Sequence, residues 1–289
     1  MITTEQRHPD TYDLDRLSTI ELVTVINRAD QLVASAVAGA LEQISNAVDA
    51  ITGRLATGGR LFYVGSGTSG RLAVLDAVEC PPTFGVSPDL VQAVLAGGYQ
   101  ACYSPIEAAE DDAAQGEADL RERGVRAADA VVGIAASGRT PYTLGAVRFA
   151  RQIGALTVGI SCNRNSPLSA EAEIPIEVET GPEVLTGSTR MKAGTAQKLI
   201  LNMLSTAVMV RLGHVYSNLM VNVHLKNKKL VERGVHIICD ITGRTEDEAR
   251  QALEKTGDAK SAVVLLKLGC GVEEARQKAA RVKLRELIG

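Results

Sequence analysis

The feature that most constrains the fold is a series of five short apolar runs separated mostly by segments with helical spacing. They are RLFYVG, VQAVLAGG, AVVGIAAS, LTVGISC and IPIEV, at residues 60–65, 91–98, 130–137, 156–162 and 174–178. Short apolar runs that alternate with helices are typical of parallel strands that are buried on both faces. Because the crossovers of such a sheet are right-handed, its strand-to-helix turns gather along one edge, where ligands bind. The sequence therefore predicts an α/β protein with a parallel sheet flanked by helices.

Helical segments are predicted on both sides of this sheet region. Ser18 and Glu21 form the pattern of a capping box, and a long stretch with helical spacing follows, which predicts two helices before the first strand. We expect residues 1–56 to pack on a core domain of residues 57–228. Residues 229–289 are expected to form a small helical C-terminal subdomain.

The last third of the chain contains an apolar helix and a repeat. The segment from Ala196 to Gly213 has so little polar surface that it is either deep core or a subunit contact, and we favour a dimer contact. In the charged tail, EARQ at residues 248–251 recurs at 274–277, which indicates a duplicated helical unit. Thr245 and Glu248 form the capping box of its first copy.

Composition excludes several classes of partner. Lys and Arg number 31 against 34 Asp and Glu, so no basic excess is available to neutralise nucleic acid. The five cysteines lack paired spacing and the histidines form no ligand cluster, so we expect reduced thiols and no metal. No segment has the length and apolarity of a leader peptide or a membrane span. We therefore expect a soluble, cytoplasmic protein that binds neither nucleic acid nor membrane.

Three turns rich in Ser, Thr and Gly precede predicted helices. They are GSGTSG at 65–70, ASGRTP at 136–141 and TGSTRMK at 186–192. The first matches G-x-G-x-x-G, but the next strand ends Leu95-Ala96-Gly97-Gly98, without the acidic residue that holds the ribose in a dinucleotide fold. Hydroxyls and free amides at a helix start suit a terminal monophosphate instead. The residues expected to bind the phosphorylated ligand from these turns are Ser66, Thr68, Ser69, Ser137, Gly138, Thr140, Ser188 and Lys192.

Ordinary helix capping is the alternative explanation for each turn taken alone. Ser and Thr are frequent N-caps, and Thr140 followed by Pro141 fits a cap and a first helical residue. An exposed lysine on a helix, as Lys192 could be, is usually only solvated. Three such turns together, two of them along one sheet edge, favour phosphate binding.

Five blocks of sequence in order carry a resemblance to a known family. They are GSGTSGRLAVLDAVECPPTFG, IEAAEDD, AASGRTPY, TVGISCN and TGSTRMKAGTAQKLILNMLST, which begin at residues 65, 106, 135, 157 and 186. Together they resemble the N-acetylmuramic acid 6-phosphate etherases of the sugar isomerase (SIS) superfamily. The resemblance runs from about Thr11 to the C-terminal tail.

This resemblance implies a flavodoxin-like parallel sheet between helices, a homodimer with its site near the subunit interface, and a UBA-like helical C-terminal unit. It implies removal of D-lactate, without cofactor or metal, from the 3-ether of N-acetylmuramic acid 6-phosphate. The other product is N-acetylglucosamine 6-phosphate, formed during recycling of cell-wall sugars. The positions that match the family's functional residues are Glu79 and Glu110 for catalysis, and Ser69, Ser137 and Thr140 at the phosphate. Glu107 is also expected to bind the substrate.

Two carboxyl groups suit this chemistry. In the ring-opened sugar the C2 proton lies beside the C1 aldehyde, so a base can remove it while an acid protonates the lactate that leaves C3. One carboxyl group must be ionised while the other is protonated, which requires different environments. From the family pattern we assign Glu110 as the base and Glu79 as the acid of a syn-type elimination followed by water addition.

Each glutamate also has an explanation without catalysis. Glu110 fits an acidic first helical turn that complements the helix dipole, and most helical glutamates are solvated. Glu79 is expected in the last turn of its helix, before Pro81 and Pro82, where a carboxylate opposes the dipole and gains nothing locally.

The spacing of these residues sets a geometric constraint. If the helix from Thr68 to Glu79 is unbroken, its rise of about 1.5 Å per residue separates Glu79 from the phosphate turn by roughly 16 Å. A hexose phosphate does not reach that far. Glu79 is therefore expected either to follow an early break in the helix or to complete the site of the partner chain.

Two other functions are compatible with parts of this pattern. A sugar-phosphate isomerase of the same superfamily begins with the same removal of the C2 proton. The glucokinase regulatory proteins resemble this family and bind sugar phosphates without turning them over. The presence of both Glu79 and Glu110 favours the enzyme, because a binding module needs no acid and base pair.

Overall fold

The computed structural model describes residues 2–223, 225 and 228–289. The chain separates into two compact units. Unit 1 comprises Met1–Ala77 and Asp89–Ser205, and unit 2 comprises Val78–Pro88 and Thr206–Gly289. The predicted domain boundaries at residues 56 and 228 stay a prediction.

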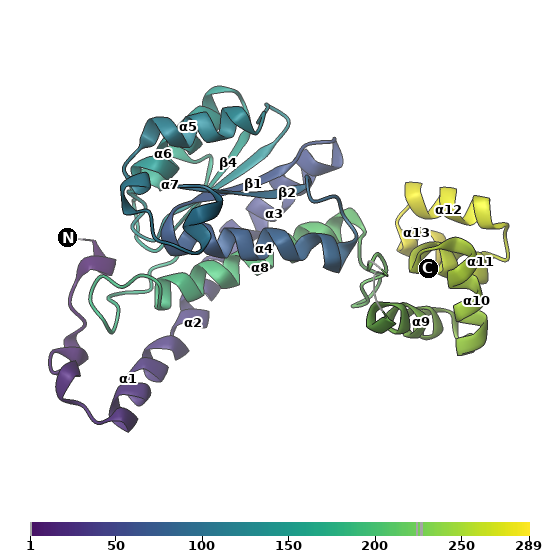
Figure 1. Ribbon diagram of the computed structural model, residues 1–289, viewed down its shortest axis with the longest axis horizontal. Coiled ribbons are helices and arrows are strands. Elements are labelled where there is room, and N and C mark those ends of the chain that lie inside the picture. Colours follow the sequence, from purple (N-terminus) through teal and green to yellow (C-terminus); the bar gives the residue numbers. More distant parts are fainter. Residues whose placement is uncertain (1, 224, 226–227) are drawn as a thin grey trace. The chain divides into compact units, whose positions relative to one another are not determined.

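A five-stranded parallel sheet with the strand order β2-β1-β3-β4-β5 forms the centre of unit 1 (Figure 1). Its strands are β1 (Leu61–Gly65), β2 (Val91–Leu95), β3 (Ala130–Ile134), β4 (Leu156–Ser161) and β5 (Ile174–Glu177). All five predicted strands and the α/β class are confirmed. This order is that of flavodoxin-like folds, in which ligands bind where the connections reverse direction, between β1 and β3.

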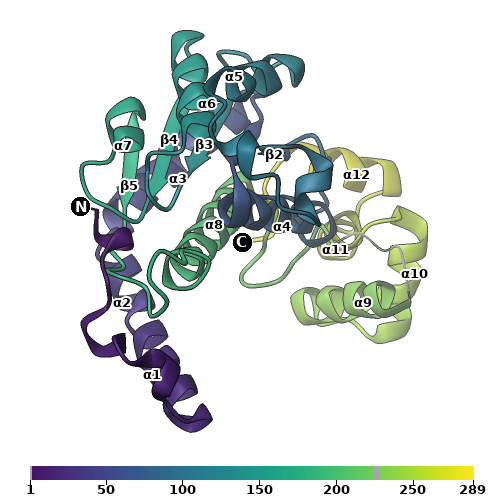
Figure 2. The ribbon, with the colours of Figure 1, turned by 60° about the vertical axis from the view of Figure 1, so that its left-hand side comes forward.

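Helices cover both faces of the sheet (Figure 2). One face carries α5 (Ala113–Glu122), α6 (Pro141–Gln152) and α7 (Pro167–Glu171), and the other carries α3 (Leu41–Ala56). Alternate side chains of β1 point to opposite faces: Phe62 packs with the α5–α6 side, whereas Tyr63 hydrogen-bonds to Asp76 on α4 (Gly67–Phe84). Both aromatic rings are 0 % exposed. Burial of such side chains contributes about 1.5–3 kcal/mol each to folding.

Three helices, not the predicted two, precede the sheet. They are α1 (Thr19–Gln31), α2 (Val33–Ala38) and α3, and the break between the first two falls at Leu32. The predicted capping box is confirmed: the Ser18 N–H donates to Glu21 Oε2 over 2.8 Å. Short 3-10 helices occur at Thr3–Glu5, Pro9–Thr11, Leu14–Arg16, Tyr99–Cys102 and Glu107–Glu110.

Two long helices, α4 (Gly67–Phe84) and α8 (Lys192–Leu212), pack together through a buried carboxyl group. Asp76 accepts hydrogen bonds from Asn202 Nδ2 at 2.9 Å and from Ser205 Oγ at 3.1 Å. Burial raises the pKa of Asp76, and these hydrogen bonds oppose the rise. The carboxyl group thus links the helix that follows β1 to the apolar helix near residue 200.

The expectation that Pro81 and Pro82 end α4 is wrong, because the helix continues through both to Phe84. A proline in a helix removes a hydrogen bond and crowds the carbonyl four residues earlier. Here both prolines lie in the last turn, and Gly85 N–H closes the helix by donating to the Pro81 carbonyl.

The apolar α8 buries one face inside the chain, but Met203 and Val210 stay 37 % and 46 % exposed.

Most of unit 2 is a helical bundle with a core of its own. Its helices are α9 (Lys228–Thr242), α10 (Glu246–Thr256), α11 (Ala259–Leu268), α12 (Val272–Arg281) and α13 (Leu284–Ile288). The predicted duplication falls on α10 and α12, where the alanines of the two EARQ copies, Ala249 and Ala275, are each 0 % exposed. The capping box of Thr245 and Glu248 is confirmed.

Among the described residues, no helix is long and apolar enough to cross a membrane. None of the five cysteines forms a disulfide. No group of three His, Cys, Asp or Glu side chains in the described part of the chain is arranged to hold a metal ion, and His224 lies outside that part.

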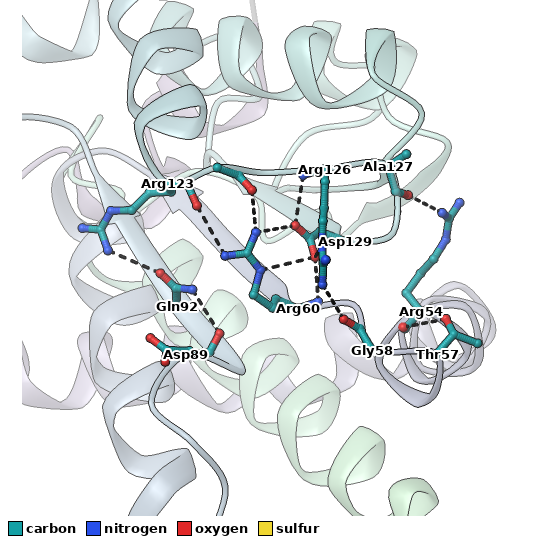
Figure 3. Close-up of polar contacts among 11 residues, drawn as sticks. Arg54, Thr57, Gly58, Arg60, Asp89, Gln92, Arg123, Arg126, Ala127 and Asp129 are labelled. Atoms are coloured by element: carbon teal, nitrogen blue, oxygen red, sulfur yellow. Dashed lines mark hydrogen bonds and ion pairs between the residues drawn. The ribbon is translucent and has the colours of Figure 1, made fainter.

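The amino end of the sheet is held by a buried carboxylate, Asp129 (Figure 3). Its Oδ1 accepts from the Arg60 backbone N–H at 2.9 Å, and its Oδ2 accepts from Arg60 Nη2 at 2.8 Å and from the Arg126 backbone N–H at 3.0 Å. Burial alone would raise the pKa of Asp129, but these hydrogen bonds outweigh burial and hold it below its usual range. Asp129 therefore joins the loops that lead into β1 and β3.

Replacement of this carboxylate is expected to destabilise unit 1. Asp129→Ala leaves Arg60 and two backbone N–H groups without their acceptor, which should cost about 3 kcal/mol at pH 7 in urea unfolding. Since the folded pKa is lowered, this stability is present above the unfolded pKa of about 4 and disappears as the pH falls through the folded value. Asp15→Ala, an exposed control, should change stability by less than about 0.5 kcal/mol. An unchanged unfolding midpoint for Asp129→Ala at pH 7 would contradict this role.

Candidate active site

A cleft of about 390 Å³ opens at the carboxyl edge of the sheet, beside the ends of β1 and β3. Its lining comes from the turns after these strands, from the segment after β2, and from two more distant segments. The lining residues are Glu5, Ser66, Gly67, Thr68, Ser69, Arg71, Ala96, Ala101, Pro105, Ile106, Glu107, Glu110, Ala136, Ser137, Thr140 and Thr189. All of them belong to unit 1.

The first turn places the start of α4 directly against the end of β1. A Cβ atom at Gly70 would lie 2.6 Å from the Gly65 carbonyl oxygen and 2.3 Å from Leu95 Cδ1, so only glycine fits. Because the helix begins at Gly67, Thr68 and Ser69 lie in its first turn, where backbone N–H groups lack partners within the helix. This arrangement is suited to an anion.

A hydrogen bond to the other long helix, α8, holds the side chain of Ser69 in place. Ser69 is 8 % exposed, and its hydroxyl donates to Gln197 Oε1 at 3.0 Å. Gln197 lies on α8 and is itself 1 % exposed. This hydrogen bond holds the side chain of Ser69 in one conformation at the edge of the cleft.

The second turn lacks the side-chain cap that would explain its threonine without a ligand. Thr140 occupies the N-cap position of α6 and Pro141 the first helical position, as predicted, but the Thr140 side chain makes no capping hydrogen bond. Its hydroxyl lines the cleft instead, together with Ser137. Gly138 does not line the cleft; its φ of +67° and its close approach to Ser166 shape the turn.

The third turn contributes differently from the expectation. Thr189 lines the cleft, whereas neither Ser188 nor Lys192 does. Lys192 is 4 % exposed, and its Nζ donates to the Thr180 carbonyl at 2.7 Å. The buried Glu183 accepts from the backbone N–H groups of Lys192 and Ala193, at 3.0 and 2.9 Å. Glu183 thus stabilises the start of α8, whereas the ammonium group of Lys192 is held by the Thr180 carbonyl and does not line the cleft.

Two of the predicted carboxylates lie in the cleft. Glu107 and Glu110 come from the 3-10 helix Glu107–Glu110, and both line the cavity. The Glu110 carboxylate lies against Gly67, since a Cβ atom there would be 2.9 Å from Glu110 Oε1. Glu110 is thus brought to the positive end of α4, where a negative charge is stabilised.

Glu79 is not among the residues that line the cleft. It is exposed and lies on α4, which runs without a break from Gly67 to Phe84. Of the two arrangements expected for Glu79, an early break in the helix is therefore wrong.

Three lining residues with polar side chains were not predicted from the sequence: Glu5, Arg71 and Thr189. Arg71 follows the first turn directly, and its Nε donates to the Ala101 carbonyl at 2.9 Å. Its position after GTSG was a signal for an anion-binding role. Glu5 carried no comparable signal, because it lies in a short N-terminal segment without helical or strand periodicity.

Known families match most of the region that forms the cleft. The glucokinase regulatory protein N-terminal SIS domain matches residues 43–151, and the SIS domain matches residues 114–207. Among solved structures, a phosphoheptose isomerase from Francisella tularensis aligns with a TM-score of 0.55 at 17 % identity, over 67 % of this chain and 100 % of that one. An Escherichia coli CFT073 protein, solved as a ligand complex, aligns with a TM-score of 0.51 at 15 % identity, over 70 % and 97 %. These likenesses show the fold.

Curated proteins match over nearly the whole chain. An N-acetylmuramic acid 6-phosphate etherase of Rubrobacter xylanophilus is 54 % identical, covering 100 % of this chain and 96 % of its own. Etherases of the same name from Pectobacterium atrosepticum and Mycolicibacterium smegmatis are each 53 % identical, covering 96 % and 100 % of this chain and 92 % and 98 % of their own.

A pair of threonine substitutions separates binding from capping. Thr140→Val should leave the stability to urea unchanged, because the side chain makes no capping bond, and should weaken binding of a hexose 6-phosphate about tenfold. Thr245→Val removes a true cap and should cost about 1 kcal/mol of stability with no effect on binding. Calorimetric titration and urea unfolding of both variants test this. Unchanged binding by Thr140→Val would contradict a phosphate role for its hydroxyl.

Proposed function

The chain belongs to the N-acetylmuramic acid 6-phosphate etherase family, and we propose that the cleft of unit 1 binds and cleaves the substrate of that family. The enzyme is a carbon–oxygen lyase that converts N-acetylmuramic acid 6-phosphate and water to N-acetylglucosamine 6-phosphate and D-lactate in the recycling of cell-wall amino sugars. The observation that carries our assignment of residues is the Glu110 carboxylate beside the turns rich in hydroxyls.

The phosphate is bound by hydroxyl and backbone N–H groups of the first two turns. Ser66, Thr68 and Ser69 surround the start of α4, and Ser137 and Thr140 lie in the neighbouring turn after β3. Phosphate oxygens accept hydrogen bonds from such donors, and the Ser69 hydroxyl, which donates to Gln197 in this structure, turns to the phosphate when the ligand binds. Arg71 supplies the positive charge at the phosphate, in place of Lys192, which does not line the cleft.

Glu110 acts as the base. It removes the C2 proton of the ring-opened sugar, whose C1 aldehyde makes that proton acidic. The C3–O bond then breaks, its electron pair leaves with the lactyl oxygen, and Glu79 as the acid protonates that oxygen. Water adds to the resulting C2=C3 bond, with its hydroxyl going to C3 and a proton returning to C2.

Glu79 completes the site of a second copy in a homodimer. Glu79 is 12 residues beyond Gly67 on an unbroken helix, a separation of about 18 Å, so one substrate cannot contact both ends of α4 in one chain. Leu75 and Val78, one helical turn apart beside Glu79, are 52 % and 58 % exposed. Such exposed apolar side chains on one helix suit an interface. This interface lies near the active site.

The protein works in the cytoplasm. Its cysteine thiols stay reduced there.

Neither alternative function is favoured. A sugar-phosphate isomerase would release no lactate, and a regulatory protein would bind sugar phosphate without turnover. The relatives that cover nearly the full chain at 53–54 % identity carry the etherase name.

Isotopes test the reaction path. In a mixture of D₂O and H₂¹⁸O, elimination followed by addition should place deuterium at C2 and ¹⁸O at C3 of the N-acetylglucosamine 6-phosphate formed. NMR and mass spectrometry of the product measure both labels. Release of D-lactate without ¹⁸O at C3 would mean cleavage on the lactyl side of the ether and would exclude this mechanism.

Mixed dimers test the shared site. Glu79→Gln and Glu110→Gln should each lower kcat at least about 100-fold, because each lacks one proton-transfer group. Refolding the two variants together in equal amounts should restore about one quarter of the wild-type activity, since half of the dimers are mixed and each of these has one intact site. The same procedure with either variant alone is the control. No recovery in proven mixed dimers would show that Glu79 acts in its own chain.

A further inference from the structure

The N-terminal segment forms one wall of the cleft. Residues Thr3–Glu5 make a single 3-10 turn, and Glu5 lines the cavity. The first residues of a chain are normally poorly ordered unless something ties them down. Here the segment is held by hydrogen bonds to the buried side-chain amide of Asn163, which follows β4.

Asn163 holds the segment with both ends of its amide. Its Oδ1 accepts from Thr3 Oγ1 at 2.8 Å and from the Thr4 backbone N–H at 3.4 Å, and its Nδ2 donates to Thr4 Oγ1 at 3.0 Å. Thr4 is 0 % exposed and Asn163 is 2 % exposed. Hydrogen bonds between buried groups are costly to leave unmade, so the segment has one favoured position.

The same amide connects the segment to the phosphate turn. Asn163 Nδ2 also donates to the Ala136 carbonyl at 3.0 Å, and Ala136 begins the turn that carries Ser137 and Thr140 into the cleft. Ser161 Oγ in turn donates to the Asn163 carbonyl at 2.8 Å. The wall formed by Glu5 is therefore fixed relative to the place where the phosphate binds.

The Glu5 carboxylate has acceptor capacity that the described residues do not use. No hydrogen bond or ion pair engages its side chain within the described chain. Its Oε2 would be 3.5 Å from a Cβ atom at Gly187, in the turn that carries Thr189 to the cleft. A carboxylate repels phosphate and attracts neutral donors, so it complements the hydroxyl and acetamido N–H groups of the sugar.

We propose that Glu5 is a substrate-binding residue whose carboxylate accepts hydrogen bonds from neutral donors of the sugar, and that Asn163 is its positioning residue. This inference rests on the proposed function of the cleft. Glu5 binds the part of the sugar that is remote from the phosphate and so orients C2 toward Glu110. By the same repulsion, it disfavours ligands that carry a second anionic group at this position.

Kinetics of Glu5 variants test the proposal. Glu5→Gln and Glu5→Ala should lower kcat/KM for D-lactate release about tenfold or more, mainly through a higher KM, because an interaction made equally with substrate and transition state affects KM. Glu42→Gln, on the exposed surface of α3, is the matched control and should behave as wild type. A kcat/KM within twofold of wild type for both Glu5 variants would overturn the proposal.

Product binding separates this proposal from the proposed reaction. Calorimetric titration of N-acetylglucosamine 6-phosphate requires no turnover, and Glu5→Gln should weaken its binding about tenfold. Weaker binding by Glu5→Gln than by a wild type that releases no D-lactate from the ether would refute the reaction and leave the role of Glu5 supported. Equal binding by wild type and Glu5→Gln would overturn the role of Glu5 whatever the reaction is.

A double-mutant cycle tests the positioning role. Thr4→Val keeps the shape of the side chain and removes the acceptor of Asn163, so it should raise KM in the same direction as Glu5→Ala. Added to Glu5→Ala, it should have little further effect, because both changes act through one carboxylate. If Thr4→Val does not fold, Thr3→Val gives the same test, because Thr3 also hydrogen-bonds to Asn163 and is less buried than Thr4. Thr52→Val on α3 is the control. Full additivity of the two changes would overturn the positioning role.

Discussion

Close contact between the end of β1 and the first turn of α4 is the constraint on which the site depends. Gly65 and Gly70 let the backbone turn from strand to helix within a few residues, with no room for a Cβ atom at position 70. The parallel strand order then places the turn after β3 beside this helix start. Hydroxyl groups, free N–H groups and the Glu110 carboxylate are thereby brought to one cleft.

Much of this arrangement was predictable because local patterns and long-range packing agree. The strands are apolar on both faces, and the capping boxes at Ser18 and Thr245 lie where their sequences predict. The helix through Pro81 and Pro82 was not predictable, because a proline outside the first turn removes a helical hydrogen bond and crowds the carbonyl four residues earlier. The inward side chain of Lys192 depends on Glu183 and Thr180, which only folding brings near it.

The carboxylates assigned to the active site lie in two separate places. Glu5, Glu107 and Glu110 line the cleft, whereas Glu79 is separated from it along a continuous helix. Elimination needs an acid as well as a base, and in the proposed mechanism a second copy of the chain supplies the acid. In the proposal for Glu5, the N-terminal segment held by Asn163 orients the sugar and leaves proton transfer to Glu79 and Glu110.

In the proposed site, one cleft holds the phosphate at the turns after β1 and β3 and presents C2 of the sugar to Glu110. A crystal structure of Glu110→Gln with N-acetylmuramic acid 6-phosphate is the decisive experiment. Phosphate oxygens are expected within hydrogen-bonding distance of the hydroxyls of Ser69, Ser137 and Thr140, with C2 facing the residue 110 side chain. A phosphate bound away from these hydroxyls, or a C2 atom that faces away from residue 110, would contradict this arrangement.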